Sequence, residues 1–337
     1  MAFASVQAKV NEDFAHFIKG SEPSLDADIL KVYQEFLLEF KGKAFDVKKD
    51  MDRFIIFRSN MREIIAHNSN PHKTWEMGIN HLSDMTAEER LKYYSLMEDQ
   101  KCSATASPRN VYNDEAPESF NWVDLDMVSP VKDQKQCGSC WTFSTTGAME
   151  AHFKIHQGAE VLLSEQELVD CPDAIVYDTH GCSGGLPSYA FNFIRDFGIE
   201  TENDYPYQAH DASCRLDESK YRITTSGPYN ITAGDEEQMK EELYHNGPIS
   251  VAFQVVSDFT NYQSGVYSST LCKNGPMNVN HAVLAVGYGT ENGVDYWLVK
   301  NSWSEHWGDQ GYFKIQRGVN MCGIAVCNSY PLEVRNV

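Results

Sequence analysis

The chain has 337 residues and 42% hydrophobic residues, which predicts two domains, or a two-lobed body with an appendage, and excludes a chain disordered throughout. Its formal charge is −20, and residues 116–337 hold 13 Lys and Arg against 29 Asp and Glu. An acidic body repels phosphate backbones, so we expect no nucleic-acid partner.

The first 97 residues are predicted to be mostly helical. Between Asp46 and Asn68, apolar residues recur at spacings of three and four, which is typical of one face of a long helix. No apolar run in the chain reaches the roughly 18–20 residues that a membrane span needs, so no span is expected. Residues 1–20 also lack the apolar core of a signal peptide. Residues 98–119 are polar and rich in Pro, Ser and Asn, which predicts a linker.

After Asn121 the pattern predicts helices first and strands later, which indicates an α+β protein with two lobes. One helix is expected to begin at Ser139 or Cys140 and run towards His156. A capping box formed by Ser164 and Glu167 predicts the start of a second helix. A third helix is predicted from Gly185 to Phe197, where Gly198 ends it. The predicted strands cover residues 249–255, 281–288, 295–300 and 312–315.

Nine cysteines are widely spaced along the chain, at positions 102, 137, 140, 171, 182, 214, 272, 322 and 327. An odd number suggests four disulfides and one reactive thiol, which requires an oxidising compartment. We therefore expect a signal sequence to have preceded this chain and the protein to be lysosomal or secreted.

The segment 134–151 (QKQCGSCWTFSTTGAMEA) points to nucleophilic chemistry. A helix N-terminus stabilises a thiolate, and Cys140 stands where the predicted helix begins. The thiolate needs an imidazole as proton partner, for which His281 is the candidate. Asn301 can orient that imidazole through its amide oxygen, and Trp303 can shield their hydrogen bond from water. The Gln134 amide and the Cys140 backbone N–H are the expected donors to an oxyanion.

Other interpretations of these residues stay open at this point. Cys137 and Cys140 have the spacing of a thioredoxin-like redox pair, although no strand is predicted just before them. His152 and His156 lie four residues apart on a helix, but Phe153 replaces the glutamate of a zinc protease, so no metal or other cofactor is expected. Gly184 and Gly185 are either a simple turn or an edge along which a substrate backbone binds.

Cys137-Gly138-Ser139-Cys140-Trp141, with His281 and Asn301 downstream, resembles the signature of the papain family of cysteine proteases. The resemblance covers residues 116–337. It implies a helical lobe at about 125–228 and a β-barrel lobe at about 229–326, with the active site in the cleft between them. It further implies an apolar pocket for the substrate's second side chain lined by Leu186, Pro187, Ala252 and Ala282. The implied disulfides are Cys137–Cys182, Cys171–Cys214 and Cys272–Cys322.

Residues 1–115 resemble the inhibitory prosegment of the same family, which blocks the cleft intramolecularly. A helix motif is matched by Arg53, Phe57, Asn60, Ile64 and Asn68, with Lys49 in place of its Glu. A second motif is matched by Gly78, Asn80 and Asp84, with Leu82 where Phe is usual. Ser304 also departs from the family, which has Gly at that position after Asn-Ser-Trp.

Residues 98–105 (EDQKCSAT) are similar to the mini-chain of the cathepsin H-like branch, an octapeptide cut from the prosegment and retained by a disulfide. That resemblance implies a Cys102–Cys327 bond and a Thr105 carboxylate that holds the substrate's free ammonium. It also implies glycosylation at Asn230, the first residue of an Asn-Ile-Thr sequon.

The resulting hypothesis is a cysteine peptidase made as a zymogen, mainly an aminopeptidase with some endopeptidase activity, that acts on peptides and proteins and binds cystatin-like inhibitors. A plain endopeptidase is the alternative if Thr105 is never freed. An inert homologue that only binds proteases and a thiol oxidoreductase are the alternatives from other classes.

Overall fold

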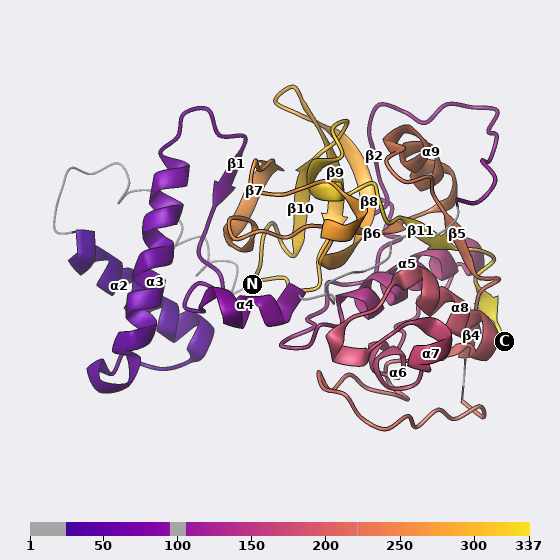
Figure 1. The fold of residues 1–337 in the computed structure, drawn as a ribbon, viewed down its shortest axis with the longest axis horizontal. Helices are drawn as coiled ribbons and strands as arrows, with labels where there is room; N and C mark the ends of the chain where they lie inside the picture. The colour runs from indigo at the N-terminus through magenta and orange to yellow at the C-terminus, as the bar shows by residue number, and fades with distance from the viewer. Residues whose placement is uncertain (1–24, 95–105, 221) are drawn as a thin grey trace.

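The computed structural model describes residues 25–94, 106–220 and 222–337, and nothing is said below of the structure of the rest. Figure 1 shows the prosegment helices on the left, the β-sheet in the middle and the other helices on the right. The α+β class with a helical prosegment is thereby confirmed, and no helix in the described ranges is long and apolar enough to cross a bilayer.

The prosegment begins with helix α2 (Leu25–Lys41), which packs against helix α3 (Val47–Asn68). The Asp46 side chain caps α3 by accepting a hydrogen bond from the Lys48 N–H, 2.9 Å away. Tyr33 of α2 lies 4.9 Å from Phe57 of α3, ring centre to ring centre. The predicted helix face is buried, because its apolar residues meet α2 rather than water.

Strand β1 (Trp75–Met77) and helix α4 (Ala87–Tyr94) complete the described prosegment. β1 pairs antiparallel with β7 (Tyr262–Tyr267), so the prosegment adds a strand to the main sheet. The Trp75 ring packs on Tyr267 at 4.9 Å between centres, and one hydrophobic core runs from the prosegment into the sheet.

The helices on the right of Figure 1 gather around α5 (Cys140–Gln157). Every residue of α5 from Cys140 to Phe153 is buried. Helix α8 begins at Pro187, so the prediction that it begins at Gly185 was wrong by two residues. Gly184 and Leu186 lie outside helical backbone geometry, and Pro187 suits the first helical position. The other elements are α6 (Glu165–Asp170), α7 (Ala174–Tyr177) and short 3₁₀ turns at Gly181–Ser183, Phe259–Asn261, Pro276–Asn278 and Met321–Gly323.

The predicted capping box at α6 is half right. Ser164 Oγ accepts from the Glu167 N–H at 2.9 Å, as expected. The Glu167 carboxylate does not return the bond to Ser164 but accepts from the Glu200 N–H and pairs with Arg222 at 3.0 Å. Arg222 and Glu167 are both buried, so the tertiary ion pair takes the carboxylate away from its local role.

In the described part of the chain, the main sheet has the order β1-β7-β10-β9-β8-β6-β11-β5, and β2 pairs with β8. The four predicted strands are confirmed within a few residues as β6, β8, β9 and β10, whereas β1, β2, β5, β7 and β11 of this sheet were not predicted. A second sheet has three strands in the order β12-β4-β3. Through it, the C-terminal end of the chain lies beside helices α5 and α8. The remaining bounds are β2 (Phe120–Asn121), β3 (Ile199–Glu200), β4 (Arg222–Thr224), β5 (Pro228–Asn230), α9 (Glu236–Asn246), β6 (Ile249–Phe253), β8 (His281–Glu291), β9 (Val294–Lys300), β10 (Tyr312–Gln316), β11 (Ser329–Pro331) and β12 (Arg335–Asn336).

The segment 106–119 was predicted as a linker, and it carries no helix or strand. It is nevertheless held closely, because Tyr112 Oη donates to the buried carboxylate of Glu242 at 2.6 Å and Asn110 Nδ2 donates to it at 3.0 Å.

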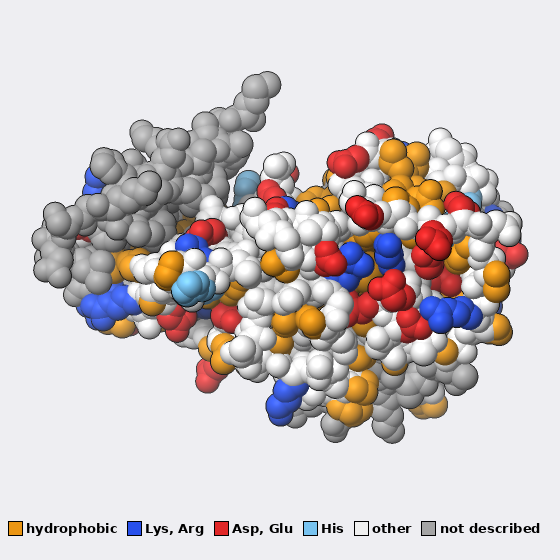
Figure 2. Space-filling model, turned by 90° about the horizontal axis from the view of Figure 1, so that it is seen from above, with side chains coloured by type: hydrophobic (Ala, Val, Ile, Leu, Met, Phe, Trp, Pro, Cys, Tyr) orange, Lys and Arg blue, Asp and Glu red, His pale blue; other side chains and the backbone are white. Residues whose placement is uncertain are grey.

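The surface seen from above carries many acidic side chains. Figure 2 shows them mainly on the right of the view, with basic side chains between them. This arrangement agrees with the excess of Asp and Glu in residues 116–337.

Candidate active site

Cys140 is the first residue of α5 and is completely buried. Among the described cysteines it is the free one. The backbone N–H of Ala282 donates to its sulfur at 3.4 Å, which brings the first turn of α5 against the beginning of β8. A thiolate formed here is stabilised both by that N–H and by the positive end of the helix dipole.

His281 is the first residue of β8, and Asn301 directly follows the end of β9. His281 Nε2 lies 2.8 Å from Asn301 Oδ1, and that oxygen also accepts from the Ser302 N–H at 2.8 Å. Since the oxygen can only accept, Nε2 carries a proton and the neutral ring leaves Nδ1 as a base. Nδ1 is buried and has no hydrogen-bond partner among the described residues, so it is available to a neighbouring thiol.

Trp303 covers this hydrogen bond. Its ring lies 4.8 Å from that of His281, centre to centre, and is completely buried. The indole N–H donates to the carbonyl of Tyr93 in α4 at 3.2 Å. A prosegment helix is therefore bonded directly to a residue of the site.

Burial sets the charge state of both reacting groups in this closed form. It raises the pKa of the Cys140 thiol to about 12, against smaller effects of backbone N–H groups in the opposite direction. It lowers the pKa of His281 to about 4, although the bond to Asn301 acts the other way. The neutral thiol and neutral imidazole are therefore favoured, which is a resting state rather than a thiolate–imidazolium pair.

Gln134 lies in the loop before α5, and its backbone N–H and side-chain amide make three hydrogen bonds. Its N–H donates to the Ser302 carbonyl at 2.9 Å, and its Oε1 accepts from Ser302 Oγ at 2.6 Å. Nε2 donates one hydrogen to the Cys137 carbonyl at 2.9 Å. The second hydrogen on Nε2 remains for another acceptor.

Of the residues predicted for the substrate pocket, Leu186 and Pro187 line one pocket, together with Asn230 and Cys327. Ala252 and Ala282 do not line it. They face each other across β6 and β8, and Ala252 packs near Val326 and Cys327. Asn230 ends β5, and its side chain is only half-buried.

The glycine pair forms a close approach as well as a turn. Gly184 has φ = 118°, which favours glycine, and its carbonyl accepts from the His180 N–H at 2.7 Å. A Cβ on Gly185 would meet the Trp141 ring at 2.8 Å. Gly184 therefore needs glycine for its backbone conformation and Gly185 needs it for packing against Trp141, whatever their contact with substrate.

The structure contains the disulfides Cys137–Cys182, Cys171–Cys214 and Cys272–Cys322, which are the pairs that the resemblance implies. Since Cys137 is bonded to Cys182, it does not form a redox pair with Cys140, and the thioredoxin-like alternative loses its basis. Cys327 is disulfide-bonded. Cys102 and Thr105 lie outside the described residues, as does the whole mini-chain segment 98–105.

The first of the two helical histidines is engaged by other groups of the protein. His152 is buried, and its Nε2 bonds to the Pro248 carbonyl at 3.0 Å. Its ring stacks on Tyr330 with centres 5.7 Å apart. Within the ranges that the structure describes, no group of His, Cys, Asp and Glu side chains is arranged to hold a metal ion.

Ser304 has φ = 70°, in the left-handed region where a side chain is strained. This backbone conformation explains why glycine is usual at that position. The Ser304 N–H donates to the Lys132 carbonyl at 3.1 Å, which holds the strained turn after Trp303 in place.

The prosegment motif residues serve mainly to hold the prosegment together. Arg53 donates to Glu89 at 2.6 Å, and Asn60 donates to the Ser83 carbonyl at 2.8 Å. Asn80 reaches across to the body of the protein, where its Nδ2 donates to the Thr260 carbonyl at 2.9 Å.

The remaining motif residues make contacts by hydrogen bonding, ion pairing or burial. Asn68 bonds to the backbone of Met77, and Asp84 pairs with Lys41 at 3.2 Å. Phe57, Ile64 and Leu82 are completely buried, and a Cβ on Gly78 would meet the Gln263 side chain at 2.5 Å.

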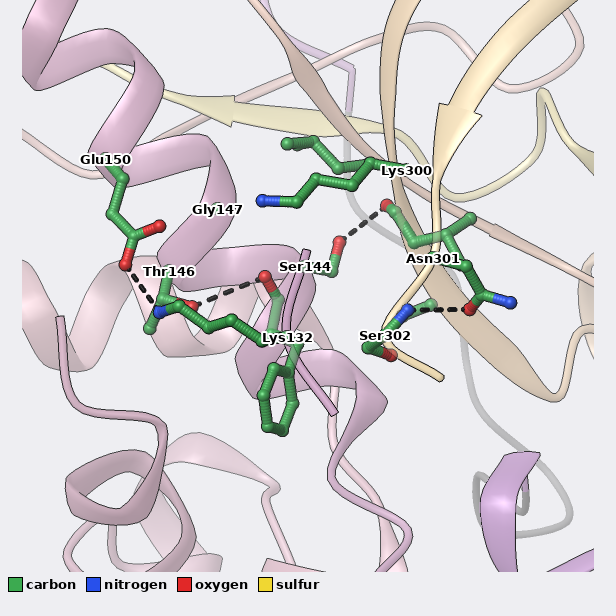
Figure 3. A pocket seen from close by; sticks show the side chains of 12 residues that line it. Lys132, Ser144, Thr146, Gly147, Glu150, Lys300, Asn301 and Ser302 are labelled. Atoms are coloured by element: carbon green, nitrogen blue, oxygen red, sulfur yellow. Dashed lines mark hydrogen bonds and ion pairs between the residues drawn. The ribbon is translucent and has the colours of Figure 1, made fainter. Parts of the chain in front are cut away.

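A buried charge network behind the site was not predicted. Figure 3 shows Lys132, Glu150 and Lys300 around a small cavity that Asn301 and Ser302 also line. Lys132 Nζ lies 2.7 Å from Glu150 and 2.6 Å from Glu165, and these carboxylates raise its pKa although burial acts to lower it. Burial lowers the pKa of Lys300 to about 8. No sequence signal separates these residues from surface charges, because each lies in a segment of ordinary composition.

Two family models match the chain. The one described as "Papain family cysteine protease" covers residues 116–332, and the one described as "Cathepsin propeptide inhibitor domain (I29)" covers residues 33–90.

Curated relatives extend over most of the chain. It is 47% identical to "Pro-cathepsin H" of Bos taurus over 304 residues, which is 90% of each protein. It is 45% identical to "Thiol protease aleurain" of Arabidopsis thaliana over 294 residues, 86% of this chain and 81% of the relative. The solved structure of digestive procathepsin L2 from Tenebrio molitor superposes with a TM-score of 0.83 at 36% identity and covers 90% of this chain and 99% of that one. The chain therefore belongs to the papain family of cysteine proteases, and it carries the inhibitory propeptide of a zymogen.

Proposed function

We propose that this cysteine peptidase zymogen matures into an enzyme that acts mainly as an aminopeptidase, in a lysosomal-type compartment or outside the cell. The chemistry rests on one observation: the Cys140 sulfur at the start of α5 lies against β8, whose first residue is the His281 that Asn301 orients. Cys140 attacks the scissile carbonyl, and His281 takes the thiol proton and returns it to the leaving amine. The Gln134 amide and the Cys140 N–H stabilise the oxyanion.

Asn301→Ala should lower kcat by roughly tenfold to a hundredfold without abolishing turnover, because it releases the His281 ring but leaves the thiol in place. Steady-state kinetics on a peptide substrate measure this. Asn246→Ala is a matched control, since it removes a half-buried amide bonded to Glu242 at 2.8 Å, remote from the thiol. An unchanged kcat in the Asn301 variant would remove Asn301 from the catalytic group.

The aminopeptidase proposal is supported by the place of Cys327. This residue lines the same pocket as Leu186 and Pro187, which the family resemblance assigns to the substrate's second side chain. An octapeptide tethered there by a Cys102–Cys327 bond would fill the pocket, so that a substrate could place only its first residue before the scissile bond. Cleavage after Thr105 would create a carboxylate beside the substrate's ammonium. Such a charge-assisted contact is worth roughly 1.5–3 kcal/mol, or about ten- to a hundredfold in preference.

Cys102→Ser should lower cleavage of substrates with a free amino terminus and raise cleavage of amino-blocked peptides and proteins, because the octapeptide leaves with its tether. The ratio of the two kcat/KM values, measured after acid processing, reports the change. Ser103→Ala is the matched control within the octapeptide and should keep the parent ratio.

A Cys102 variant that is processed and active but keeps the parent ratio contradicts the mini-chain and favours the plain endopeptidase. Glycosylation of Asn230 and binding of cystatin-like inhibitors remain predictions. Asn230 lines the pocket beside Cys327, so a carbohydrate there would border the tethered octapeptide.

A further inference from the structure

Tyr207 connects the two segments that carry the proposed oxyanion donors. It lies in the loop after β3, and its hydroxyl donates to the Gln134 carbonyl at 2.8 Å. The same hydroxyl lies 2.6 Å from Ser139 Oγ. A phenol has one proton, and the Gln134 carbonyl can only accept it, so Ser139 must donate to Tyr207. The result is a directional chain of hydrogen bonds from Ser139 through Tyr207 to Gln134.

Ser139 is the N-cap residue of α5, and its side chain makes no capping bond. A serine in this position ordinarily accepts a hydrogen bond from an N–H of the first helical turn. Here the hydroxyl is directed to Tyr207 instead, and the Ser139 backbone carbonyl accepts from the Thr142 N–H at 2.8 Å. The Ser139 hydroxyl thus does not cap α5 but bonds to Tyr207, which in turn bonds to the loop that contains Gln134.

Tyr207 is itself held by one contact of its ring and one of its backbone. It packs edge-on against Phe143 in the first turn of α5, with ring centres 5.0 Å apart. The Tyr207 N–H donates to Glu202 Oε1 at 2.9 Å. Burial raises the pKa of Tyr207, so the phenol keeps its proton at every pH at which a peptidase works.

We propose that Tyr207 is a positioning residue, which holds the Gln134 amide and the Cys140 N–H at the separation that the oxyanion requires. Gln134 lies in a loop, so its distance from α5 is set by side-chain contacts rather than by a helix or strand. Ser302 fixes Gln134 to the β side of the site, and Tyr207 fixes it to the start of α5. This inference rests on the proposed peptidase mechanism and adds a residue to it that touches neither substrate nor thiol.

The test compares two reactions of Cys140 in the full-length chain after acid processing. Peptide hydrolysis needs the oxyanion donors, whereas alkylation by iodoacetamide needs only the thiolate. Tyr207→Phe keeps the ring and removes the hydroxyl. We expect kcat to fall roughly tenfold, with KM and the alkylation rate within about twofold of the parent.

Ser139→Ala removes the hydroxyl at the other end of this chain of hydrogen bonds. It provides a second, independent test if Tyr207→Phe folds poorly. The double variant should lose little more than the larger single loss, because both changes break one chain of bonds. Tyr205→Phe is the matched control. Its hydroxyl donates to Asp170 at 2.8 Å, and its removal should leave both rates at the parent values.

Equal losses in hydrolysis and alkylation would overturn the inference, because they indicate general damage to the site. An unchanged kcat in both Tyr207→Phe and Ser139→Ala would overturn it too. A processed parent that is alkylated at Cys140 but hydrolyses no peptide contradicts the proposed function instead.

Discussion

Cys140→Ala should abolish peptide hydrolysis, with a loss of about four orders of magnitude or more, because no other described thiol is free to act as nucleophile. Folding should persist. Cys140 takes part in no disulfide, and alanine is the most favourable residue for a helix. Activity is measured on a peptide substrate after processing by an added protease, since the variant cannot cut itself. Circular dichroism and a melting curve check the fold.

A thiol titration provides the control for this variant. The processed parent should expose one reactive thiol and the variant none, whereas a redox protein would cycle two. Near-normal turnover by a folded Cys140→Ala chain would falsify the cysteine-peptidase mechanism.

Release of the prosegment should become about tenfold to a hundredfold more favourable between pH 7 and pH 4.5, and we assign much of this change to His81. His81 stands in the prosegment motif between Asn80 and Leu82. Both of its ring nitrogens are buried and have no hydrogen-bond partner in the described ranges. Burial, with Lys41 and His306 facing it, lowers the pKa of His81 to about 4. The Tyr93 ring lies 6.1 Å away and carries no charge that could offset a protonated imidazole.

The direction of the effect follows from the lowered pKa. The released prosegment binds a proton at His81 near pH 6.5, and the docked one does so only near pH 4. Docking is therefore fully stable above about pH 6.5 and loses stability as the pH falls towards 4. The Arg53 bond lowers the pKa of Glu89 to about 2, so this pair weakens only below about pH 4.5. Glu39 acts in the opposite direction, because burial raises its pKa.

His81→Gln should remove most of this pH dependence, because an amide of similar size does not titrate. We expect the activation midpoint to move about one unit towards acid. Prosegment release is measured in a Cys140→Ala background by sensitivity to an added protease, which separates release from self-cleavage. His72→Gln, a change at an exposed prosegment histidine, is the matched control. An activation curve unchanged by His81→Gln would assign the acid response to other groups.

Local patterns were enough to predict the elements whose signals lie within a few neighbouring residues. The long helix of the prosegment follows from apolar residues at spacings of three and four, and the start of α5 follows from the residues around Cys140. The strands β6, β8, β9 and β10 are rich in apolar and aromatic residues and were found for that reason. Strand β7 was missed, because its sequence, YQSGVY, contains a glycine and polar residues that suit a loop equally well.

The roles of Cys140, His281 and Asn301 were also proposed from the sequence, since thiol chemistry needs a helix start, an imidazole and an orienting amide. The structure adds the distances between them, and it adds the residues that hold them in place. Tyr207 lies 68 residues from Ser139 in the chain, and no local pattern connects the two.

The sequence by itself thus determined the family, helices α3, α5, α6 and α8 and four of the nine strands that the structure describes in the main sheet, and it supplied the candidate reacting side chains. Each depends on residues that are neighbours in the chain or on the chemistry of single groups. Only the tertiary structure decided that β1 extends the main sheet and that the Glu167 carboxylate pairs with Arg222 rather than completing its own helix cap. It also decided that Lys300 is buried and that Lys132 pairs with the buried carboxylates of Glu150 and Glu165. These outcomes depend on which groups, far apart in the sequence, are brought together away from water. A buried charge without a partner costs free energy, and an exposed strand edge leaves backbone N–H and C=O groups unpaired.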